Sequence, residues 1–235
     1  MSTQKVAVIT GASQGIGAAL VTAYRKLGYA VVATSRSITP SDDPLVLAVA
    51  GDIADPAVGG RVIDQALSTF GRVDTLINNA GVFVAKPFTD YTDQDYDLVT
   101  GINLRGFFEV SKRAIAAMLA QGGGHVVNIT ASVVDHANST LPSALASLTK
   151  GGLNAVTKSL AIEYATRGVR VNAVSPGTIR TPMHSADLHE FLAGLQPVGR
   201  MGEISDIVDA VSYLETAGFV TGEILHVDGG LSAGH

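Results

Sequence analysis

The chain has 235 residues, a formal net charge of -5, 46% hydrophobic and only 16% charged residues, and no cysteine. This length can bury one large core without a second domain. The acidic balance excludes a basic surface for nucleic acid or anionic membranes, and the lack of cysteine excludes disulfides and thiolate sites. A small-molecule function is therefore favoured. The first residues enter a strand-like run with no signal-peptide pattern, and no stretch is long enough to cross a bilayer, which predicts a cytoplasmic protein.

Short β-branched apolar runs alternate with longer amphipathic stretches along the whole chain. Runs that are apolar on both faces suit parallel strands covered by helices on each side. The pattern predicts a single α/β domain over residues 1–235, a Rossmann fold whose doubly wound parallel sheet has seven strands and about six helices. The Pro-, Ser- and Asp-rich stretch 37–44 is interpreted as a surface loop. The predicted strands are residues 5–10, 30–35, 45–50, 75–79, 125–130, 170–175 and 223–227.

A glycine-rich turn, "TGASQGIG" (10–17), directly follows the first predicted strand and opens a helix. Its G-x-x-x-G-x-G spacing differs from G-x-G-x-x-G, but it offers the same tight turn, close backbone approach and helix N-terminus to a pyrophosphate. A turn that serves only packing is the alternative, and the order strand, turn, helix argues against it. The turn residues predicted to bind a dinucleotide are Gly11, Ser13, Gln14, Gly15, Ile16 and Gly17.

The end of the second predicted strand indicates which dinucleotide binds. A carboxylate at this place holds the ribose 2′-hydroxyl of NAD, whereas a basic side chain accepts the 2′-phosphate of NADP. Here the strand ends with Ser35 and Arg36, and no acidic residue stands beside them. The sequence therefore predicts NADP as the cofactor, with NAD as the second option. A solvated surface arginine is the alternative interpretation of Arg36.

Motifs along nearly the whole chain resemble, in order, those of the short-chain dehydrogenase/reductase family. They are "TGASQGIG", "GDI" (51–53), "NNAG" (78–81), Asn103 in "INLRG", Ser132 in "NITAS", "PGTIRTP" (176–182) and "VTGEILHVDGG" (220–230). The resemblance implies a homodimer or homotetramer that uses long helices, here 95–120 and 146–166. It also implies cofactor contacts to the adenine from Asp52 and Ile53, to the middle of the cofactor from Asn79, Ala80 and Gly81, and to the nicotinamide from Pro176, Gly177, Ile179 and Thr181.

The resemblance also implies a catalytic tetrad of Asn, Ser, Tyr and Lys, with the lysine four residues after the tyrosine on one helix. Asn103, Ser132 and Lys150 occupy three of these positions, and Ala146 stands where the tyrosine is expected. In that scheme Asn103 positions a water, Ser132 donates to the substrate oxygen, and Lys150 holds the cofactor ribose and supplies positive charge. Residues from 144 onward predict the long helix that carries Ala146 and Lys150 on one face.

No neighbouring residue replaces the missing phenol by a simple shift. Leu145 restores the usual distance from Ser132 but has no proton to give, and Tyr164 lies roughly 21 Å beyond Lys150 along a continuous helix. Ser143 shares the face of Lys150, but it follows a proline and is predicted to be the N-cap of the helix. A relay through water or Ser143 is the remaining route for the proton.

Two other clusters suggest different chemistry. Asp135 and His136 after Ser132 invite a Ser-His-Asp interpretation, but no G-x-S-x-G elbow is present and a solvated loop is favoured. His184 and His189 lie five residues apart, which is off one helical face, so no metal site is predicted. Residues 183–201 are expected to form a mobile lid over a mainly apolar pocket. That pocket is predicted to include Phe83, Val84, Val133, Val134, Met183, Leu188, Phe191 and Leu192.

The favoured hypothesis is an NADP-dependent oxidoreductase that exchanges a hydride with a small alcohol or carbonyl compound and binds neither nucleic acid nor membranes. The loss of a general acid at Ala146 predicts impaired turnover. The alternative is a cofactor-binding protein without turnover, acting as a sensor or as a partner subunit. A third interpretation is an ordinary enzyme in which alanine has replaced the tyrosine at this position.

Overall fold

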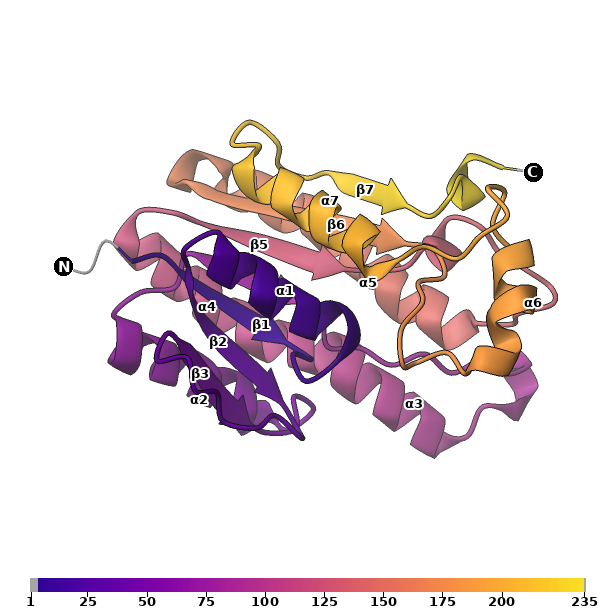
Figure 1. Ribbon diagram of the computed structural model, residues 1–235, viewed down its shortest axis with the longest axis horizontal. Helices are drawn as coiled ribbons and strands as arrows, with labels where there is room; N and C mark the ends of the chain where they lie inside the picture. The colour runs from indigo at the N-terminus through magenta and orange to yellow at the C-terminus, as the bar shows by residue number, and fades with distance from the viewer. Residues whose placement is uncertain (1–3, 235) are drawn as a thin grey trace.

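The computed structural model describes residues 4–234, which form a parallel sheet covered by helices on both faces (Figure 1). The strand order is β3-β2-β1-β4-β5-β6-β7, with every neighbouring pair parallel. This confirms the predicted Rossmann fold and all seven strands, whose ends differ from the prediction by at most one residue. The strands are β1 (Val6–Thr10), β2 (Ala30–Ser35), β3 (Val46–Ala50), β4 (Thr75–Asn78), β5 (Gly124–Ile129), β6 (Val169–Pro176) and β7 (Ile224–Val227).

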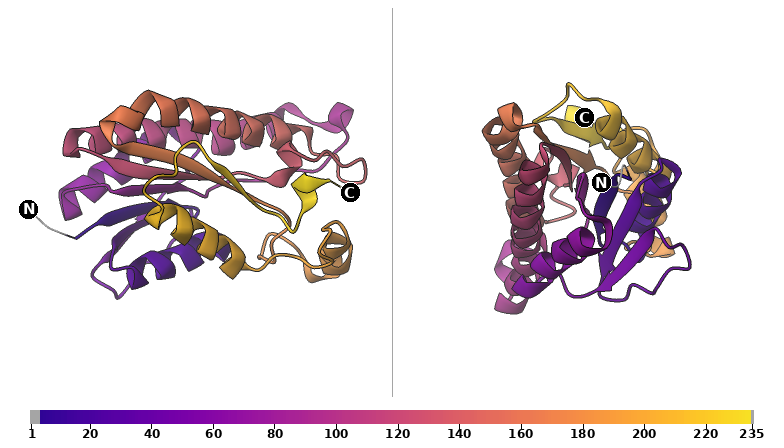
Figure 2. Two further views of the ribbon diagram at one scale, coloured as in Figure 1. Left: turned by 90° about the horizontal axis from the view of Figure 1, so that it is seen from above. Right: turned by 90° about the vertical axis from the view of Figure 1, so that its left-hand side faces the viewer.

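The apolar strand runs build two cores, one on each face of the sheet. Val6 and Val8 pack into the core beneath α2, α4 and α5, whereas Ala7 and Ile9 face the core beneath α1 and α7. Figure 2 shows the two helical layers on opposite sides of the sheet. The helices are α1 (Gly15–Lys26), α2 (Pro56–Phe70), α3 (Asp93–Thr100), α4 (Phe107–Gln121), α5 (Ala144–Tyr164), α6 (His189–Gly194) and α7 (Ile204–Thr216).

Local sequence signals fix several helix ends. Asp55 caps α2 by accepting from the Ala57 amide, Pro56 follows at the first helical position, and Gly71 ends the helix with a left-handed φ of 82°. Thr92 and Asp95 form a reciprocal capping box at the start of α3. Ser143 is the N-cap of α5, as predicted, although its side chain makes no capping bond.

The predicted helix over residues 95–120 is present as one unbroken helical run, but its hydrogen-bond pattern changes midway. A π-helical segment, η2 (Gly101–Gly106), separates α3 from α4. Its two terminal glycines lower the helical propensity, and Asn103 within it bonds through its side chain to the backbone of Val82. The tertiary contacts of Asn103 therefore accompany a local widening of the helix, which helical periodicity did not predict.

The strand order reverses direction at β1. β2 and β3 lie on one side of β1, and β4 to β7 follow on the other side. The loops at the carboxyl ends of β1 and β4 therefore diverge and leave a crevice, the usual ligand position in open α/β sheets. In the described part of the chain, no helix has the length and apolar character needed to span a bilayer.

Candidate active site

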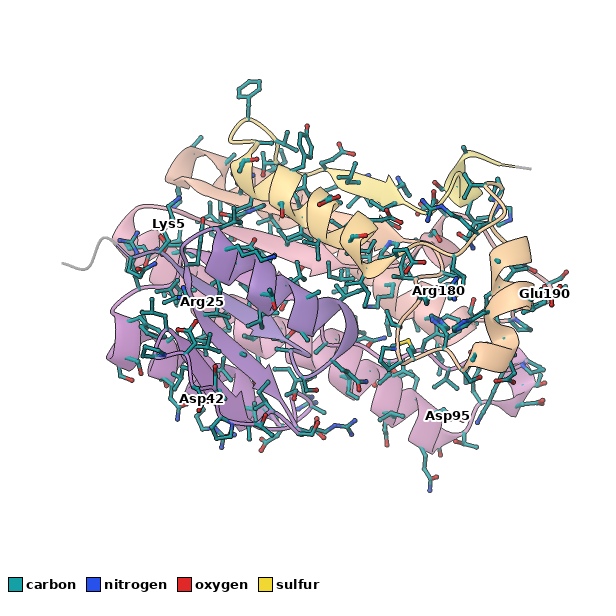
Figure 3. The ribbon with its side chains drawn as sticks, viewed as in Figure 1. Lys5, Arg25, Asp42, Asp95, Arg180 and Glu190 are labelled. Carbon is teal, nitrogen blue, oxygen red and sulfur yellow. The ribbon has the colours of Figure 1, made fainter. Side chains whose placement is uncertain are left out.

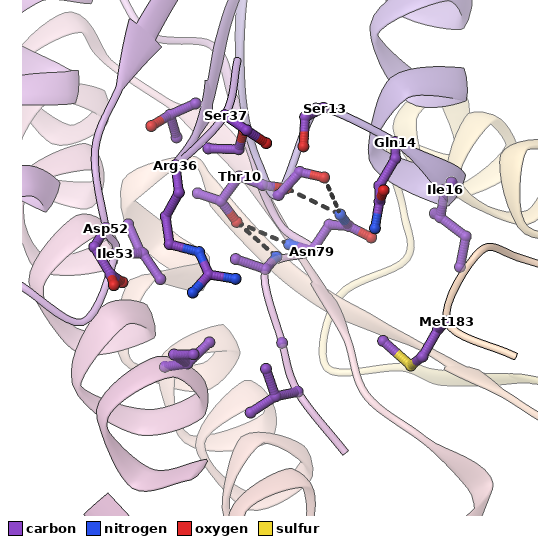
Figure 4. Close-up of a pocket in the computed structure, with 18 of the residues that line it drawn as sticks. Thr10, Ser13, Gln14, Ile16, Arg36, Ser37, Asp52, Ile53, Asn79 and Met183 are labelled. Atoms are coloured by element: carbon purple, nitrogen blue, oxygen red, sulfur yellow. Dashed lines mark hydrogen bonds between the residues drawn. The ribbon is translucent and has the colours of Figure 1, made fainter. Parts of the chain in front are cut away.

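A cleft of about 270 Å³ occupies this crevice (Figure 4). It gathers most of the residues predicted from the sequence to bind a dinucleotide, from five separate stretches of chain. The predicted residues that line it are Gly11, Ser13, Gln14, Gly15, Ile16, Ser35, Arg36, Asp52, Ile53, Asn79, Ala80, Gly81 and Thr181. Thr10, Thr34, Ser37, Gly51, Val82, Ile102, Pro182 and Met183 complete the lining.

The glycine-rich turn gives the cleft a backbone wall. Gly15 has a φ of +57°, which L-residues rarely adopt, and a Cβ on Gly17 would lie 2.2 Å from the carbonyl oxygen of Gly11. Gly17 therefore lies behind the lining and allows α1 to pack closely on the turn. The first turn of α1 contains no acidic residue, and Gln14 makes no side-chain cap. Its amide groups and the helix dipole are therefore available to an anion.

A set of hydrogen bonds joins the loops that follow β1 and β4 at the cleft. The Thr10 hydroxyl oxygen accepts hydrogen bonds from the backbone amides of Asn79 (3.0 Å) and Ala80 (2.9 Å). In return, Asn79 Nδ2 donates to the backbone carbonyls of Thr10 (3.0 Å) and Gly11 (3.2 Å). Figure 4 shows these bonds at the centre of the site. The sequence prediction missed Thr10, although a polar residue that ends a buried strand was a usable signal.

The end of β2 presents cationic and hydroxyl groups to the cleft. Figure 4 shows the exposed side chain of Arg36 directed into it, and among residues 4–234 this guanidinium has no hydrogen bond or ion pair. The buried hydroxyls of Thr34 and Ser35 also lack a partner in the described residues. The unpaired guanidinium of Arg36 at the cleft fits an anionic ligand group, so the residues present suit a ribose 2′-phosphate.

The side chains predicted to be catalytic do not line the cleft. Asn103 and Ser132 are buried, with 1% and 2% of their surface exposed. Asn103 Oδ1 accepts the Val82 amide (3.0 Å), and Nδ2 donates to the Val82 carbonyl and to Thr149 Oγ1, both at 3.1 Å. Both amide protons of Asn103 are thus used within the protein. These bonds hold the segment after β4, and the role of Asn103 in positioning a water stays a prediction.

Lys150 is a buried cation on α5. Its Nζ donates to the Ile129 carbonyl at the end of β5, at 2.8 Å. Burial lowers the pKa of Lys150 to about 8. One turn earlier on the same helix lies Ala146, with 1% of its surface exposed, and Leu145 beside it is also buried. Neither side chain carries a proton donor.

The loop after β6 contributes less to the cleft than the sequence suggested. Of its predicted cofactor residues, only Thr181 lines the cleft. Gly177 and Ile179 face a separate cavity of about 420 Å³ together with Gln196 and Asp228. Pro176 ends β6 and pairs in register with Val227 of β7. The cofactor contacts predicted for Pro176, Gly177 and Ile179 therefore stay predictions.

The segment predicted as a lid contains α6 and lies at the carboxyl end of the sheet (Figure 1). Arg180 bonds His189 Nδ1 at 3.0 Å and Glu203 at 3.1 Å, and Figure 3 shows Arg180 near α6. His184 Nδ1 bonds the Ile179 carbonyl at 2.9 Å. These contacts engage both histidines with this loop. Residues 4–234 hold no group of three or more histidine or acidic side chains placed to bind a metal ion.

Comparison with protein-family models gives a match over residues 11–232 to the family described as enoyl-(acyl carrier protein) reductase. L-xylulose reductase from Mus musculus is 37% identical over 97% of this chain and 96% of its own. The chain belongs to the short-chain dehydrogenase/reductase family. Among solved structures of this family, ElxO with NADP bound is 26% identical, with a TM-score of 0.91 over 99% of this chain and 100% of its own.

A second structural neighbour holds the other nicotinamide cofactor. The 3-ketoacyl-(acyl-carrier-protein) reductase from Brucella melitensis, complexed with NADH, is 31% identical, with a TM-score of 0.88 over 98% of this chain and 100% of its own. As a member of the short-chain dehydrogenase/reductase family, the protein is a nicotinamide-dependent oxidoreductase that acts on an alcohol or a carbonyl compound.

Proposed function

We propose that this protein is an NADP-dependent reductase or dehydrogenase of a small carbonyl or alcohol compound. The observation that carries the choice of NADP is the unpaired guanidinium of Arg36 in the cleft, beside the unpaired hydroxyl of Ser35. No acidic residue directly adjoins Ser35 and Arg36 in the chain to oppose a 2′-phosphate. NADP is also the cofactor in the ElxO structure.

The predicted site residues receive the following roles in this proposal. The glycine-rich turn and the α1 N-terminus bind the pyrophosphate, and Asp52 and Ile53 flank the adenine. Ser132 orients the substrate oxygen, and Lys150 binds the nicotinamide ribose. The bound nicotinamide exchanges the hydride. The positions that complete the cofactor contacts are Gly11, Ser13, Gln14, Gly15, Ile16, Gly17, Asn79, Ala80, Gly81, Pro176, Gly177, Ile179 and Thr181.

We further propose that Ala146 occupies the position of the family's catalytic tyrosine. Its place four residues before Lys150 on α5 supports this assignment, because that spacing stacks two side chains on one helical face. This feature also favours the second candidate function, cofactor binding without turnover. Oxidation of NADPH in the presence of a carbonyl compound separates the two, because only the oxidoreductase consumes the cofactor.

Calorimetry with NADP and NAD tests the cofactor assignment. Arg36→Ala is expected to weaken NADP binding by about 10- to 100-fold, because hydrogen bonds to charged groups contribute roughly 1.5–3 kcal/mol, while NAD binding stays unchanged. Arg167→Ala is the matched control, since Arg167 is exposed at the far end of α5. Equal affinity of the unmodified protein for both dinucleotides contradicts the assignment.

We propose a homo-oligomer, a tetramer or dimer, that uses the outer faces of α4 and α5. Figure 2 shows these helices side by side, and the outer side of this layer exposes Phe108 (55%), Leu148 (60%) and Ile162 (79%). Light scattering at micromolar concentration is expected to give a multiple of the 24.2 kDa chain mass. A monomer at that concentration refutes this assembly. The cytoplasmic location stays a prediction from the sequence.

A further inference from the structure

Lys150 ends in a buried ammonium group that is only partly hydrogen-bonded. One proton of Nζ goes to the Ile129 carbonyl at 2.8 Å, and among residues 4–234 no other partner accepts from it. The residue keeps 9% of its surface exposed. Because an ammonium group carries three donors, two of them remain available. Burial of a charge with two unused donors is costly unless a bound molecule accepts them.

The unused donors lie against the wall of the cleft. A Cβ placed on Gly81 would lie only 2.9 Å from Lys150 Nζ, and Gly81 itself lines the cleft. The missing side chain of Gly81 therefore lets the ammonium approach the cleft from behind. The same point lies 3.4 Å from Asn103 Oδ1, which places Lys150 and Asn103 at one spot of this wall.

The other proton donors around Lys150 are already used by the protein. Both amide protons of Asn103 go to Val82 and Thr149. The Thr149 hydroxyl donates in turn to the Leu145 carbonyl at 2.8 Å. Ala146 has no proton to give, and a serine hydroxyl such as that of Ser132 is a much weaker acid than an ammonium group. Lys150 is thus the strongest acid with uncommitted protons at this wall.

We propose that Lys150 itself donates the proton to the substrate oxygen during carbonyl reduction, directly or through one water, a role that rests on the proposed oxidoreductase function. The carbonyl carbon accepts the hydride and its oxygen takes a proton from Nζ. The electron pair of the broken N–H bond stays on nitrogen, which leaves a neutral amine. The amine then takes a proton from solvent, so one carbonyl, one hydride and one proton yield one alcohol.

Burial tunes Lys150 for this role. It lowers the pKa of the Lys150 ammonium from 10.5 to about 8, and no charged side chain contributes to that shift. A general acid is most effective when its pKa lies near the working pH, because it is then both protonated and ready to release the proton. At neutral pH Lys150 is therefore mainly the protonated ammonium, and the neutral amine lies only slightly higher in free energy.

The test uses NADPH with two probe carbonyls, 2,3-butanedione and 9,10-phenanthrenequinone. Lys150→Arg keeps the positive charge and the hydrogen-bond donors for the ribose, but a guanidinium does not release a proton near neutral pH. The variant is expected to bind NADPH within about threefold of the unmodified protein and to lose roughly 10²–10⁴-fold in kcat, the usual size of general-acid effects. Lys158→Arg, on the exposed face of the same helix, is the matched control.

A second readout needs no turnover. Acylation of Lys150 by acetic anhydride, followed by peptide mass spectrometry between pH 6 and 10, reports its titration in the protein without substrate, with Lys158 as internal reference. The expected midpoint is about 8, and kcat/KM for reduction is expected to fall above the same pH. A kcat/KM profile that stays flat across the measured titration of Lys150 overturns the proposal.

The remaining outcomes separate this proposal from the proposed function. If Lys150→Arg keeps more than a third of the parent kcat, the proton comes from elsewhere and the proposal fails. If the parent is inactive with both probes and Ala146→Tyr is active, the hydride-transfer site is intact but Lys150 is not the donor. If both are inactive while NADPH binds, the oxidoreductase function itself fails in favour of cofactor binding alone.

Discussion

Two buried charged side chains, Glu215 and Lys150, lie at opposite ends of the sheet and differ sharply in their hydrogen-bond partners. Glu215, near the end of α7, lies at the amino ends of the strands, where its carboxylate accepts hydrogen bonds from four side chains. These are the hydroxyls of Tyr24 (2.8 Å), Tyr29 (2.8 Å) and Thr75 (3.1 Å) and His125 Nδ1 (3.0 Å). Lys150, at the carboxyl ends of the strands, has the single partner Ile129 in the described residues.

The pKa values follow this difference in partners. Burial opposes ionisation of Glu215, but the bonds from His125, Tyr29 and Tyr24 outweigh it and lower the pKa of Glu215 to about 2. Burial also lowers the pKa of His125, so this imidazole is neutral and donates from Nδ1, while its Nε2 accepts from Asn172 at 3.1 Å. The satisfied carboxylate stabilises the sheet. The Lys150 ammonium has lost most of its hydration and makes one hydrogen bond, so a ligand that accepts its other protons would lower its free energy. Such a group marks a functional position.

The largest expected effect is the loss of the carboxylate at the amino end. Glu215→Ala is expected to lower the free energy of unfolding by about 4 kcal/mol, because it leaves several buried donors unpaired. Urea unfolding at pH 7 measures the loss, and Asp209→Ala on the exposed face of α7 is the control with little effect. A loss below about 1 kcal/mol contradicts the structural role of Glu215.

Glu215 is also expected to make the free energy of unfolding depend on pH in the acid range. The folded-state pKa of Glu215 lies below its ordinary 4.5, so its stabilisation is complete above pH 4.5 and is lost as the pH falls toward 2. The loss over this window is about 3 kcal/mol, at roughly 1.4 kcal/mol for each pKa unit. Glu215→Gln, compared with the unmodified protein, is expected to lack this part of the acid dependence.

At the carboxyl ends of the strands, removal of the buried charge is expected to raise the free energy of unfolding instead of lowering it. Lys150→Met is expected to stabilise the cofactor-free protein by about 2 kcal/mol at pH 7, since the roughly 3 kcal/mol cost of the buried charge is removed and one hydrogen bond is lost. Below pH 8 both folded and unfolded lysine hold the proton, and the cost is complete. Between pH 8 and 10.5 only the unfolded lysine holds it, so the cost fades as the pH rises.

Urea unfolding at pH 7 and at pH 10 measures this advantage, which is expected to shrink at the higher pH. Lys158→Met is the control on the same helix, with no expected pH-dependent gain. A destabilised Lys150→Met protein at pH 7 means that the ammonium contributes to the fold, and the contrast with Glu215 then disappears.

The smallest expected effect comes from an ion pair that water reaches. His226 Nε2 of β7 lies 3.0 Å from Asp135 Oδ2 in the loop after Ser132, and both side chains are about a third exposed. Exposed pairs contribute roughly 0.2–1 kcal/mol. Asp135→Asn is expected to lower the free energy of unfolding by less than about 1 kcal/mol. A double-mutant cycle with His226→Ala measures the coupling energy. A coupling energy above about 1 kcal/mol contradicts the prediction, because the pair would then behave like a buried one.

The sequence by itself determined the strands and the cofactor end of the cleft. β-branched apolar runs have few alternatives to buried parallel strands, so all seven were predictable from local periodicity. The glycine-rich turn and Arg36 were likewise readable because each acts through its position next to a strand end. Each of these features is local in the sequence, although the cleft as a whole gathers distant stretches of chain.

Only the tertiary structure decided how the buried polar groups are paired. Glu215 meets Tyr24 and Thr75 across 191 and 140 residues of sequence, and Asn103 meets Val82 from a π-helical turn that periodicity did not predict. The approach of Lys150 to Gly81 is of the same kind. Helical and strand periodicity report which face of an element is buried, because burial depends on hydrophobicity. They do not report which partner a buried polar atom finds, because that depends on the packing of distant elements.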